Sequence, residues 1–192
     1  MSKQVYPADR AMEVAKQLRD MLSPFCEPDR CKIVGSLRRQ KIWVGDIEIL
    51  YVPKFRLKAA DLFKESASQM TNLADEMLDS MVNQEIIKPR PNKNGVTAWG
   101  EQNKLAVHVE SGIPVDFFAT TEDGWVNALV VRTGGKQNNI QICSAARKLG
   151  WTFEAYGTGF RSLRGLPYHP TTSEKDVYDF VKLPYLEPVN RP

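Results

Sequence analysis

The chain has 192 residues, of which 42% are hydrophobic and 26% are charged, and its formal net charge is +3. This composition excludes a disordered chain and is sufficient for one buried core, or for a core with a small second lobe. No apolar run reaches the length of a membrane-spanning helix, and the first residues lack the apolar stretch of a signal peptide. We therefore expect a cytoplasmic protein without a membrane partner, and the mildly basic charge permits a nucleic-acid partner.

Cysteine and histidine residues give no sign of a metal or disulfide framework. Three cysteines without paired short spacing argue against disulfides and against a zinc site, so we expect reduced, mostly buried thiols at Cys26, Cys31 and Cys143. His108 and His169 lie far apart in the sequence and have no metal-ligand pattern near them. Both histidines are expected to be structural or surface residues.

In the first part of the chain, hydrophobic periodicity predicts an alternation of helices and strands. The expected elements are a helix over 8–22, strands over 31–36 and 43–52, a long helix over 58–83, and several short strands over 85–119. The apolar pattern of the long stretch 58–83 has helical spacing, and its methionines are expected to fill the core. The sequence therefore predicts a sheet covered by helices over residues 1–119.

From residue 123 onward the pattern returns to helix. Helices are expected over 124–132 and 138–149, and Gly150 has the position of a helix C-cap. A short strand is expected over 151–154. Further on, Ser173 and Asp176 have the spacing of a capping box, with Asp in place of the usual Glu or Gln. A boundary near residue 120 would separate the sheet-bearing part from a small C-terminal lobe, 120–192.

The first motif with chemical meaning is the segment Val34-Gly35-Ser36-Leu37-Arg38-Arg39. Glycine permits a sharp turn and a close approach of the backbone to a phosphate. Backbone N–H groups, the Ser36 hydroxyl and the Arg39 guanidinium would donate to phosphate oxygens. Taken alone, the segment describes a surface turn with solvated charges equally well.

The second motif is Gly45-Asp46-Ile47-Glu48. Residues two apart in a strand point to the same side, so Asp46 and Glu48 would present two carboxylates together while Ile47 faces the core. Two like charges on a partly buried strand are costly without a cation or a basic partner. An exposed polar strand face is the alternative. The pair follows Ser36 by ten residues, which is enough to bring the chain back beside the turn.

The third motif is Asp116 within the apolar run Val115-Asp116-Phe117-Phe118. Ionised carboxylates are rarely buried without partners, so this residue is either paired with a basic side chain or completes an oxygen-rich site with Asp46 and Glu48. Such a site suits Mg²⁺ or Mn²⁺. Two ions held there would stabilise the attacking and leaving oxygens of an in-line phosphoryl displacement, and Asp116 would lie nearest the acceptor hydroxyl.

These motifs occur in an order that resembles family X DNA polymerases. Gly-Ser-Leu-Arg-Arg is followed by Gly-Asp-Ile-Glu and by the strand aspartate, and Arg132-Thr133-Gly134-Gly135 is similar to the family's Thr-Gly turn beside the incoming nucleotide. Asn139 falls where the family has an asparagine that contacts the base. The segments 150–157 and 173–188 resemble the family's short thumb strand and its C-terminal signature. The likeness covers residues 8–191.

The resemblance implies an α+β fold: a nucleotidyltransferase palm with a mixed sheet and helices, plus a small C-terminal α/β lobe, as in small viral, bacterial and phage members. It implies DNA polymerase activity in short-gap repair, with a nucleoside triphosphate and primer/template or gapped DNA as partners, and we expect a monomer. Catalysis and metal binding would fall to Asp46, Glu48 and Asp116. The nucleotide would be bound by Gly35, Ser36, Arg39, Gly45, Thr133, Gly134 and Asn139.

Other positions depart from the family pattern and leave alternatives open. Glu48 stands where aspartate is usual, Val131 where an aromatic residue is frequent, and Cys143 where a template-contacting arginine is expected. These departures favour a template-independent transferase acting on RNA, protein or a small molecule, while Glu48 alone hints at a non-catalytic binding module. Weak candidates for contact with nucleic acid are Lys54, Arg56, Lys136 and Arg147, with Lys88, Arg90, Lys93 and Lys104 around the central loop.

Overall fold

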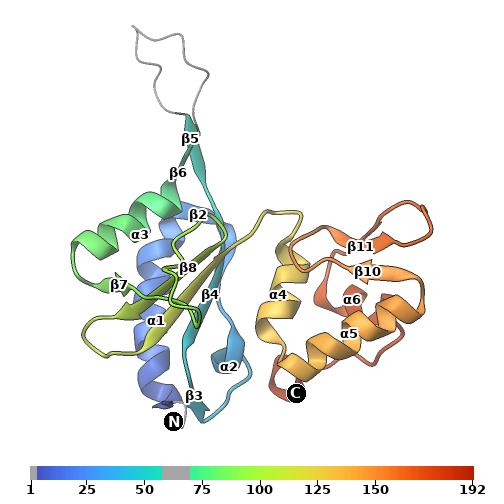
Figure 1. Ribbon diagram of the computed structural model, residues 1–192, viewed down its shortest axis with the longest axis horizontal. Helices are drawn as coiled ribbons and strands as arrows, with labels where there is room; N and C mark the ends of the chain where they lie inside the picture. Colours follow the sequence, from blue (N-terminus) through green and yellow to red (C-terminus); the bar gives the residue numbers. More distant parts are fainter. Residues whose placement is uncertain (1–3, 58–69) are drawn as a thin grey trace, which may run out of the picture.

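The computed structural model describes residues 4–57 and 70–192. Its centre is a five-stranded mixed sheet in the order β2-β4-β9-β8-β7, in which β4 and β9 are parallel and the other neighbours are antiparallel. Figure 1 shows this sheet in one lobe, and a second, mostly helical lobe beside it. The strands are β2 (Cys26–Ile33), β4 (Ile47–Pro53), β7 (Ile87–Pro89), β8 (Asn103–His108) and β9 (Pro114–Ala119).

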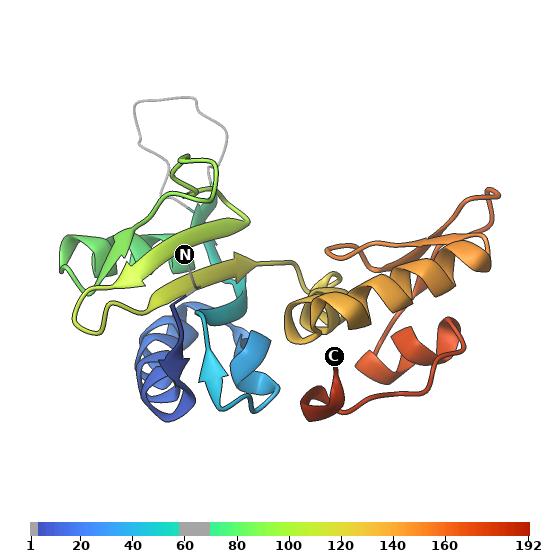
Figure 2. The ribbon, with the colours of Figure 1, turned by 60° about the horizontal axis from the view of Figure 1, so that its bottom comes forward.

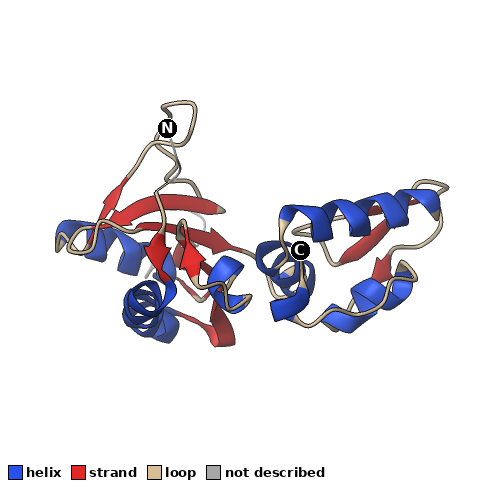
Figure 3. Cartoon of the chain, turned by 90° about the horizontal axis from the view of Figure 1, so that it is seen from below, coloured by secondary structure: helices blue, strands red, loops and turns tan. Residues whose placement is uncertain are grey.

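One face of the sheet is covered by two helices, α1 (Ala8–Leu22) and α3 (Leu73–Asn83). Both lie on the same side of the strands in Figure 3. Alternate residues of β4 and β9 point into this core, so Ile47, Ile49 and Phe117 pack with the apolar stripes of the helices and are fully buried. The opposite set of residues, which includes Glu48 and Asp116, is therefore turned away from these helices.

The other face of the sheet packs against α4 (Trp125–Thr133), the first helix after β9. Leu50, Val52 and Phe118 form a second buried cluster with Trp125 and Ala128. The cluster ties the sheet to the start of the C-terminal lobe, and Figure 2 shows the short connection from β9 to α4. The ends of β4 and β9 that carry Glu48 and Asp116 consequently face this lobe.

The C-terminal lobe has its own core, in which Val130, Ile142, Phe160 and Val177 are fully buried. This lobe contains a three-stranded antiparallel sheet, in the order β10-β11-β12, together with helices α5 and α6. Stacked and edge-on aromatic contacts among Trp151, Phe160, His169 and Phe180 add to this packing. The elements are α5 (Lys136–Lys148), β10 (Trp151–Phe153), β11 (Gly159–Ser162), β12 (His169–Pro170), α6 (Glu174–Phe180) and the 3₁₀ turn η2 (Pro188–Asn190).

Shorter elements complete the N-terminal lobe. The four-residue helix α2 (Gly35–Arg38) follows β2 and lies on the side of the sheet that faces α4, as Figure 1 shows. The pair β5 and β6 forms a two-stranded ribbon that projects from the sheet, and β1 pairs with β3. Their bounds are β1 (Tyr6–Pro7), η1 (Ser23–Phe25), β3 (Trp43–Val44), β5 (Phe55–Leu57) and β6 (Met70–Asn72).

The fold class expected from the sequence is confirmed, but three element predictions need correction. Residues 35–38 are helical instead of forming only a turn, and the expected strand 43–52 is broken at Gly45 and Asp46, so Asp46 precedes β4. The expected helix 58–83 begins only at Leu73, because 70–72 pair with β5 as a strand and Asn72 caps the helix by accepting a hydrogen bond from Asp75 N at 3.1 Å. Its first part, 58–69, lies outside the described residues.

The environments of the cysteines, Lys104 and His108 agree with expectation only in part. All three cysteines are free, but Cys143 is exposed while Cys26 is buried. Lys104, expected at the surface, is 3% exposed because its ammonium group lies 2.7 Å from Asp75 Oδ1 in an ion pair. His108 is buried and bonds Ser111 Oγ through Nδ1, as a structural histidine does. None of the helices in the described ranges has the length and apolar character needed to cross a bilayer.

The capping box predicted at α6 is present and gives a testable stability effect. Ser173 Oγ accepts from Asp176 N at 3.1 Å, and Asp176 Oδ2 accepts from Ser173 N at 3.0 Å. Ser173→Ala removes one acceptor for the first-turn N–H groups, and we expect it to lower the free energy of unfolding by about 1 kcal/mol in urea titrations. Ser80→Ala, within α3, is the matched control and is expected to change stability by less than about 0.5 kcal/mol. Equal effects of the two changes would contradict the capping role.

Candidate active site

Two of the three predicted carboxylates occupy facing positions on adjacent strands. Glu48 of β4 and Asp116 of β9 are direct partners in the parallel register. They share a face of the sheet with Leu50 and Phe118, and that face packs against α4. Asp46 precedes β4 by one residue. The sheet therefore brings Asp46, Glu48 and Asp116 from distant parts of the sequence together at the N-terminal ends of β4 and β9, beside the C-terminal lobe.

The electrostatic coupling of these acids follows from their closeness and burial. Burial and the neighbouring charges of Asp46 and Asp116 together raise the pKa of Glu48 to about 7, against the lowering effect of Arg132. Burial also raises the pKa of Asp116, while Arg90 lowers it and Asp46 raises it. Neighbouring carboxyl groups with raised pKa values repel one another when all are ionised. A bound divalent cation offsets this repulsion, and carboxylate oxygens are the ligands that hard cations prefer. The chemistry of these oxygen donors suits Mg²⁺ or Mn²⁺, and binding of either ion at this site stays a prediction.

The carboxylates do not form a closed cage. Among residues 4–57 and 70–192, no three His, Cys, Asp or Glu side chains are grouped as a metal site. Two local contacts account for this: the Glu48 carboxyl group lies against Gly35, and Asp116 bonds Arg90. The strands bring the three acids together beside the turn, as expected. Their role as metal ligands stays a prediction.

Gly35 allows the turn to lie directly on Glu48. Its φ is +64°, and a Cβ built on it would lie 1.8 Å from Glu48 Oε2, so another residue here would be strained and would require the Glu48 carboxyl group to move. The neighbouring Ser36 Oγ is buried and has no hydrogen-bond partner. A buried hydroxyl without a partner is costly, and an oxygen-rich ligand at this turn would satisfy it. Both features agree with the expected phosphate-binding role of this segment.

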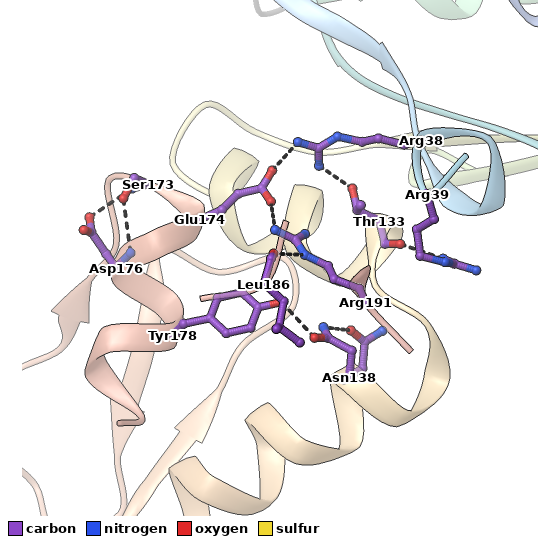
Figure 4. Close-up of polar contacts among 11 residues, drawn as sticks. Arg38, Arg39, Thr133, Asn138, Ser173, Glu174, Asp176, Tyr178, Leu186 and Arg191 are labelled. Atoms are coloured by element: carbon purple, nitrogen blue, oxygen red, sulfur yellow. Dashed lines mark hydrogen bonds and ion pairs between the residues drawn. The ribbon is translucent and has the colours of Figure 1, made fainter. Parts of the chain in front are cut away.

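The expected nucleotide-binding residues of the two lobes meet at Thr133. Arg39 Nη1 donates to the Thr133 carbonyl oxygen at 2.6 Å, as Figure 4 shows. Gly134 caps α4, and a Cβ there would lie 2.6 Å from Asn139 Oδ1. Asn139 itself donates through Nδ2 to the Val131 carbonyl at 2.9 Å. Gly45 lies apart from this group, in the bend between β3 and β4.

A second contact between the lobes runs through Glu174 at the start of α6. Arg38 donates to Thr133 Oγ1 at 2.5 Å and approaches Glu174 Oε1 at 2.6 Å. The other oxygen of Glu174 bonds Arg191, whose side chain is fully buried and also donates to the Leu186 carbonyl at 2.9 Å. Figure 4 shows the Glu174 carboxylate between the two guanidinium groups. This ion-pair network fixes α2 against the C-terminal lobe.

Four charged residues shape the site in ways that the sequence did not predict, although Arg90 had been a candidate for nucleic-acid contact. Arg132 lies over the Phe118 ring with 3.4 Å to the centroid and donates to the Tyr156 hydroxyl at 2.8 Å through Nε. Its position next to the Thr-Gly turn was the signal available in the sequence. Arg90, Glu174 and Arg191 carry no such local signal, because each acts through a partner distant in the chain.

The weak candidates for nucleic-acid contact are dispersed. Lys54 Nζ donates to the Pro24 carbonyl at 3.1 Å, and Arg56 on the ribbon strand β5 lies 3.5 Å from Glu76. Lys136 and Arg147 are exposed at the two ends of α5. The four residues form no single stripe, so contact with a nucleic-acid backbone stays a prediction for each of them.

Comparison with known proteins gives the class of fold. Residues 128–192 match the family model of the DNA polymerase beta thumb. Polymerase beta of Leishmania infantum, solved as a ternary P/T complex, has the same fold, with a TM-score of 0.76 and 19% identity over 98% of this chain and 77% of that one. The fold is thus that of DNA polymerase beta, with the sheet as the palm and the C-terminal lobe as the thumb.

The sequence relatives are also DNA polymerases. The chain is 25% identical over 184 residues to the DNA polymerase/3'-5' exonuclease PolX of Bacillus subtilis and 24% identical over 196 residues to DNA polymerase lambda of Rattus norvegicus. The alignments cover 95% and 96% of this chain but only 28% and 32% of those proteins. The resemblance to family X DNA polymerases expected from the motifs is confirmed, and the chain spans about a third of the length of these relatives.

The raised pKa of Glu48 predicts how stability depends on pH. An ordinary glutamate has a pKa of 4.5, whereas Glu48 titrates at about 7 in the folded protein, so the metal-free fold loses stability as pH rises from 4.5 through 7. We expect Glu48→Gln to remove this loss and to raise the free energy of unfolding at pH 8 by up to about 3 kcal/mol in EDTA. Urea titrations from pH 4 to 8 measure it.

The control for this change is Glu13→Gln, at an exposed position of α1. It should leave the pH profile of the wild-type protein unchanged. If Glu48→Gln and the wild-type protein keep a constant difference in stability across this pH range, Glu48 does not titrate as stated.

Proposed function

We propose that the chain carries the catalytic palm and thumb of a metal-dependent nucleotidyltransferase, a family X DNA polymerase that adds deoxynucleotides to a primer 3′-hydroxyl and releases pyrophosphate. The observation that carries this proposal is the pairing of Glu48 with Asp116 across parallel strands, beside the turn at Gly35 and Ser36. Family X resemblance and the polymerase beta fold support it.

Asp46, Glu48 and Asp116 would hold two Mg²⁺ or Mn²⁺ ions, which when bound stabilise negative charge on the transferring phosphoryl group and lower the pKa of the attacking hydroxyl. Around them, the chain's own residues bind and orient the triphosphate. Ser36 has an unpaired hydroxyl for a phosphate oxygen, and Arg39 supplies positive charge beside it. Asp116, on the central strand pair, is placed to accept or guide the proton of the acceptor hydroxyl.

The thumb would close the site from the other side. The backbone turn at Thr133 and Gly134, which Arg39 holds across the lobes, would lie beside the incoming nucleotide. Gapped or primed DNA is the expected partner, since the solved relative is a ternary P/T complex. Lys54, Arg56, Lys136 and Arg147 are proposed only as auxiliary backbone contacts.

One observation favours a second acceptor class. Cys143 is exposed on α5 at the position where the family resemblance implies a template-contacting arginine. A neutral thiol there removes a contact to the template strand and is compatible with template-independent transfer to RNA or another hydroxyl. Both candidates use the same carboxylates and differ in what they extend.

Primer extension tests the proposal and separates the candidates. Purified protein is incubated with Mg²⁺ or Mn²⁺ and single-stranded, primed or one-nucleotide-gapped DNA, with deoxyribo- and ribonucleotides in parallel. The polymerase proposal predicts insertion that follows the template base and is strongest on gapped DNA. Extension regardless of template would support the second candidate, and inactivity on all substrates, with no metal-dependent triphosphate binding in calorimetry, would contradict both.

A further inference from the structure

Arg90 lies in one row across the sheet with the paired carboxylates. It directly follows β7, and its backbone N donates to the Leu105 carbonyl of β8 at 2.9 Å. Leu105 is the register partner of Asp116, and Asp116 is the register partner of Glu48. Arg90, just after β7, therefore lies in register with Leu105 of β8, Asp116 of β9 and Glu48 of β4, and its side chain crosses β8 to reach Asp116.

The guanidinium group of Arg90 is anchored by the main chain and by Asp116, and Nη1 also lies 3.5 Å from the Pro91 carbonyl oxygen. Its Nε donates to the Ala106 carbonyl of β8 at 3.1 Å, and its Nη2 bonds Asp116 Oδ1. The Arg90 and Asp116 side chains are only 26% and 15% exposed, so solvent competes weakly for the contact. A planar fork held by a backbone carbonyl can present its other N–H groups in only one direction. The arginine consequently fixes the rotation of the Asp116 carboxylate.

We propose that Arg90 is a positioning residue for Asp116. By bonding one carboxylate oxygen of Asp116, Arg90 leaves the other oxygen to face Glu48 and the cation site. This inference rests on the proposed function of the three carboxylates. It assigns to Arg90 a role different from the nucleic-acid contact expected from the sequence. Partners of this kind in the shell around metal ligands typically change metal affinity or activity about 10–100-fold when removed.

The test compares Arg90→Gln and Arg90→Lys with the wild-type protein in three measurements: single-nucleotide insertion kinetics, Mn²⁺ binding by electron paramagnetic resonance without DNA, and thermal unfolding. For Arg90→Gln we expect kcat to fall and Mn²⁺ binding to weaken, each by about 10–100-fold, with KM for the triphosphate changed less than about threefold. Arg90→Lys keeps the charge but lacks the fork, so it should recover only part of the loss.

Arg30→Gln is the matched control, because Arg30 Nε pairs with Glu122 Oε2 at 2.8 Å at a distance from the carboxylates, and it should leave kcat and Mn²⁺ affinity unchanged. The inference is overturned if Arg90→Gln retains wild-type kcat and Mn²⁺ affinity, if Arg90→Lys recovers both fully, or if the loss merely follows a fall in melting temperature. A wild-type protein that neither binds Mn²⁺ nor extends a primer would instead overturn the proposed function, and this inference with it.

Discussion

Replacing Asp116 with asparagine is expected to lower kcat for primer extension by at least about a thousandfold. Asparagine keeps the size of the side chain but removes the negative charge that faces Glu48 from β9. Loss of an anionic ligand at a catalytic cation removes several kcal/mol of transition-state stabilisation, and about 1.4 kcal/mol corresponds to each tenfold change in rate. Single-turnover insertion on gapped DNA with saturating Mg²⁺ measures the loss without interference from product release.

Asp123→Asn is the matched control for this change, because Asp123 is exposed in the turn before α4. It should retain wild-type kcat. Asp116→Asn should also fold with undiminished stability, since burial raises the pKa of Asp116 and its charge is costly in the metal-free state. A kcat within tenfold of the wild-type value would show that Asp116 has no part in the chemistry.

Removing the Glu174 side chain is expected to produce the largest loss of stability. Glu174→Ala leaves Arg191 with its charge in a fully buried position and with the Leu186 carbonyl as the remaining acceptor of its Nε. Breaking one side of a buried ion pair typically costs 3–5 kcal/mol, because the remaining charge cannot be solvated. Urea denaturation at neutral pH, followed by circular dichroism, should show a decrease of about this size.

The control lies on the same helix. Asp179 forms an exposed i,i+4 pair with Lys175 at 2.5 Å, so Asp179→Ala should cost less than about 1 kcal/mol. Combining Glu174→Met with Arg191→Met removes both charges and is expected to recover much of the loss of the single variant. Equal destabilisation by Glu174→Ala and Asp179→Ala would mean that the network between the lobes contributes nothing.

The positions of the palm strands could be predicted because their side chains alternate. Ile47, Ile49, Val115 and Phe117 are apolar and buried on one face, so the acids between them had to point to the other. The strand β6 could not be predicted in this way. Residues 70–72 continue a helical spacing of apolar residues, and pairing with β5 overrides that local preference.

The side-chain contacts around the candidate site could not be predicted from the sequence. Arg90 bonds Asp116 across 26 residues, and Arg38 bonds Thr133 across 95. Such pairs depend on the order of strands in the sheet and on the seating of the C-terminal lobe, which no local pattern encodes. The motifs at Gly35, Asp46 and Thr133 have local signatures because backbone turns and strand spacing require particular residue types there.

A crystal structure with Mn²⁺ and a non-hydrolysable deoxynucleoside triphosphate would test whether Asp46, Glu48 and Asp116 bind the cation, since anomalous scattering locates the metal independently of the protein atoms. We expect Mn²⁺ at the N-terminal ends of β4 and β9, coordinated by oxygens of Asp46, Glu48 and Asp116, with the triphosphate against Gly35 and Ser36. Manganese bound elsewhere while Glu48 stays against Gly35, or a triphosphate bound away from these acids, would contradict it.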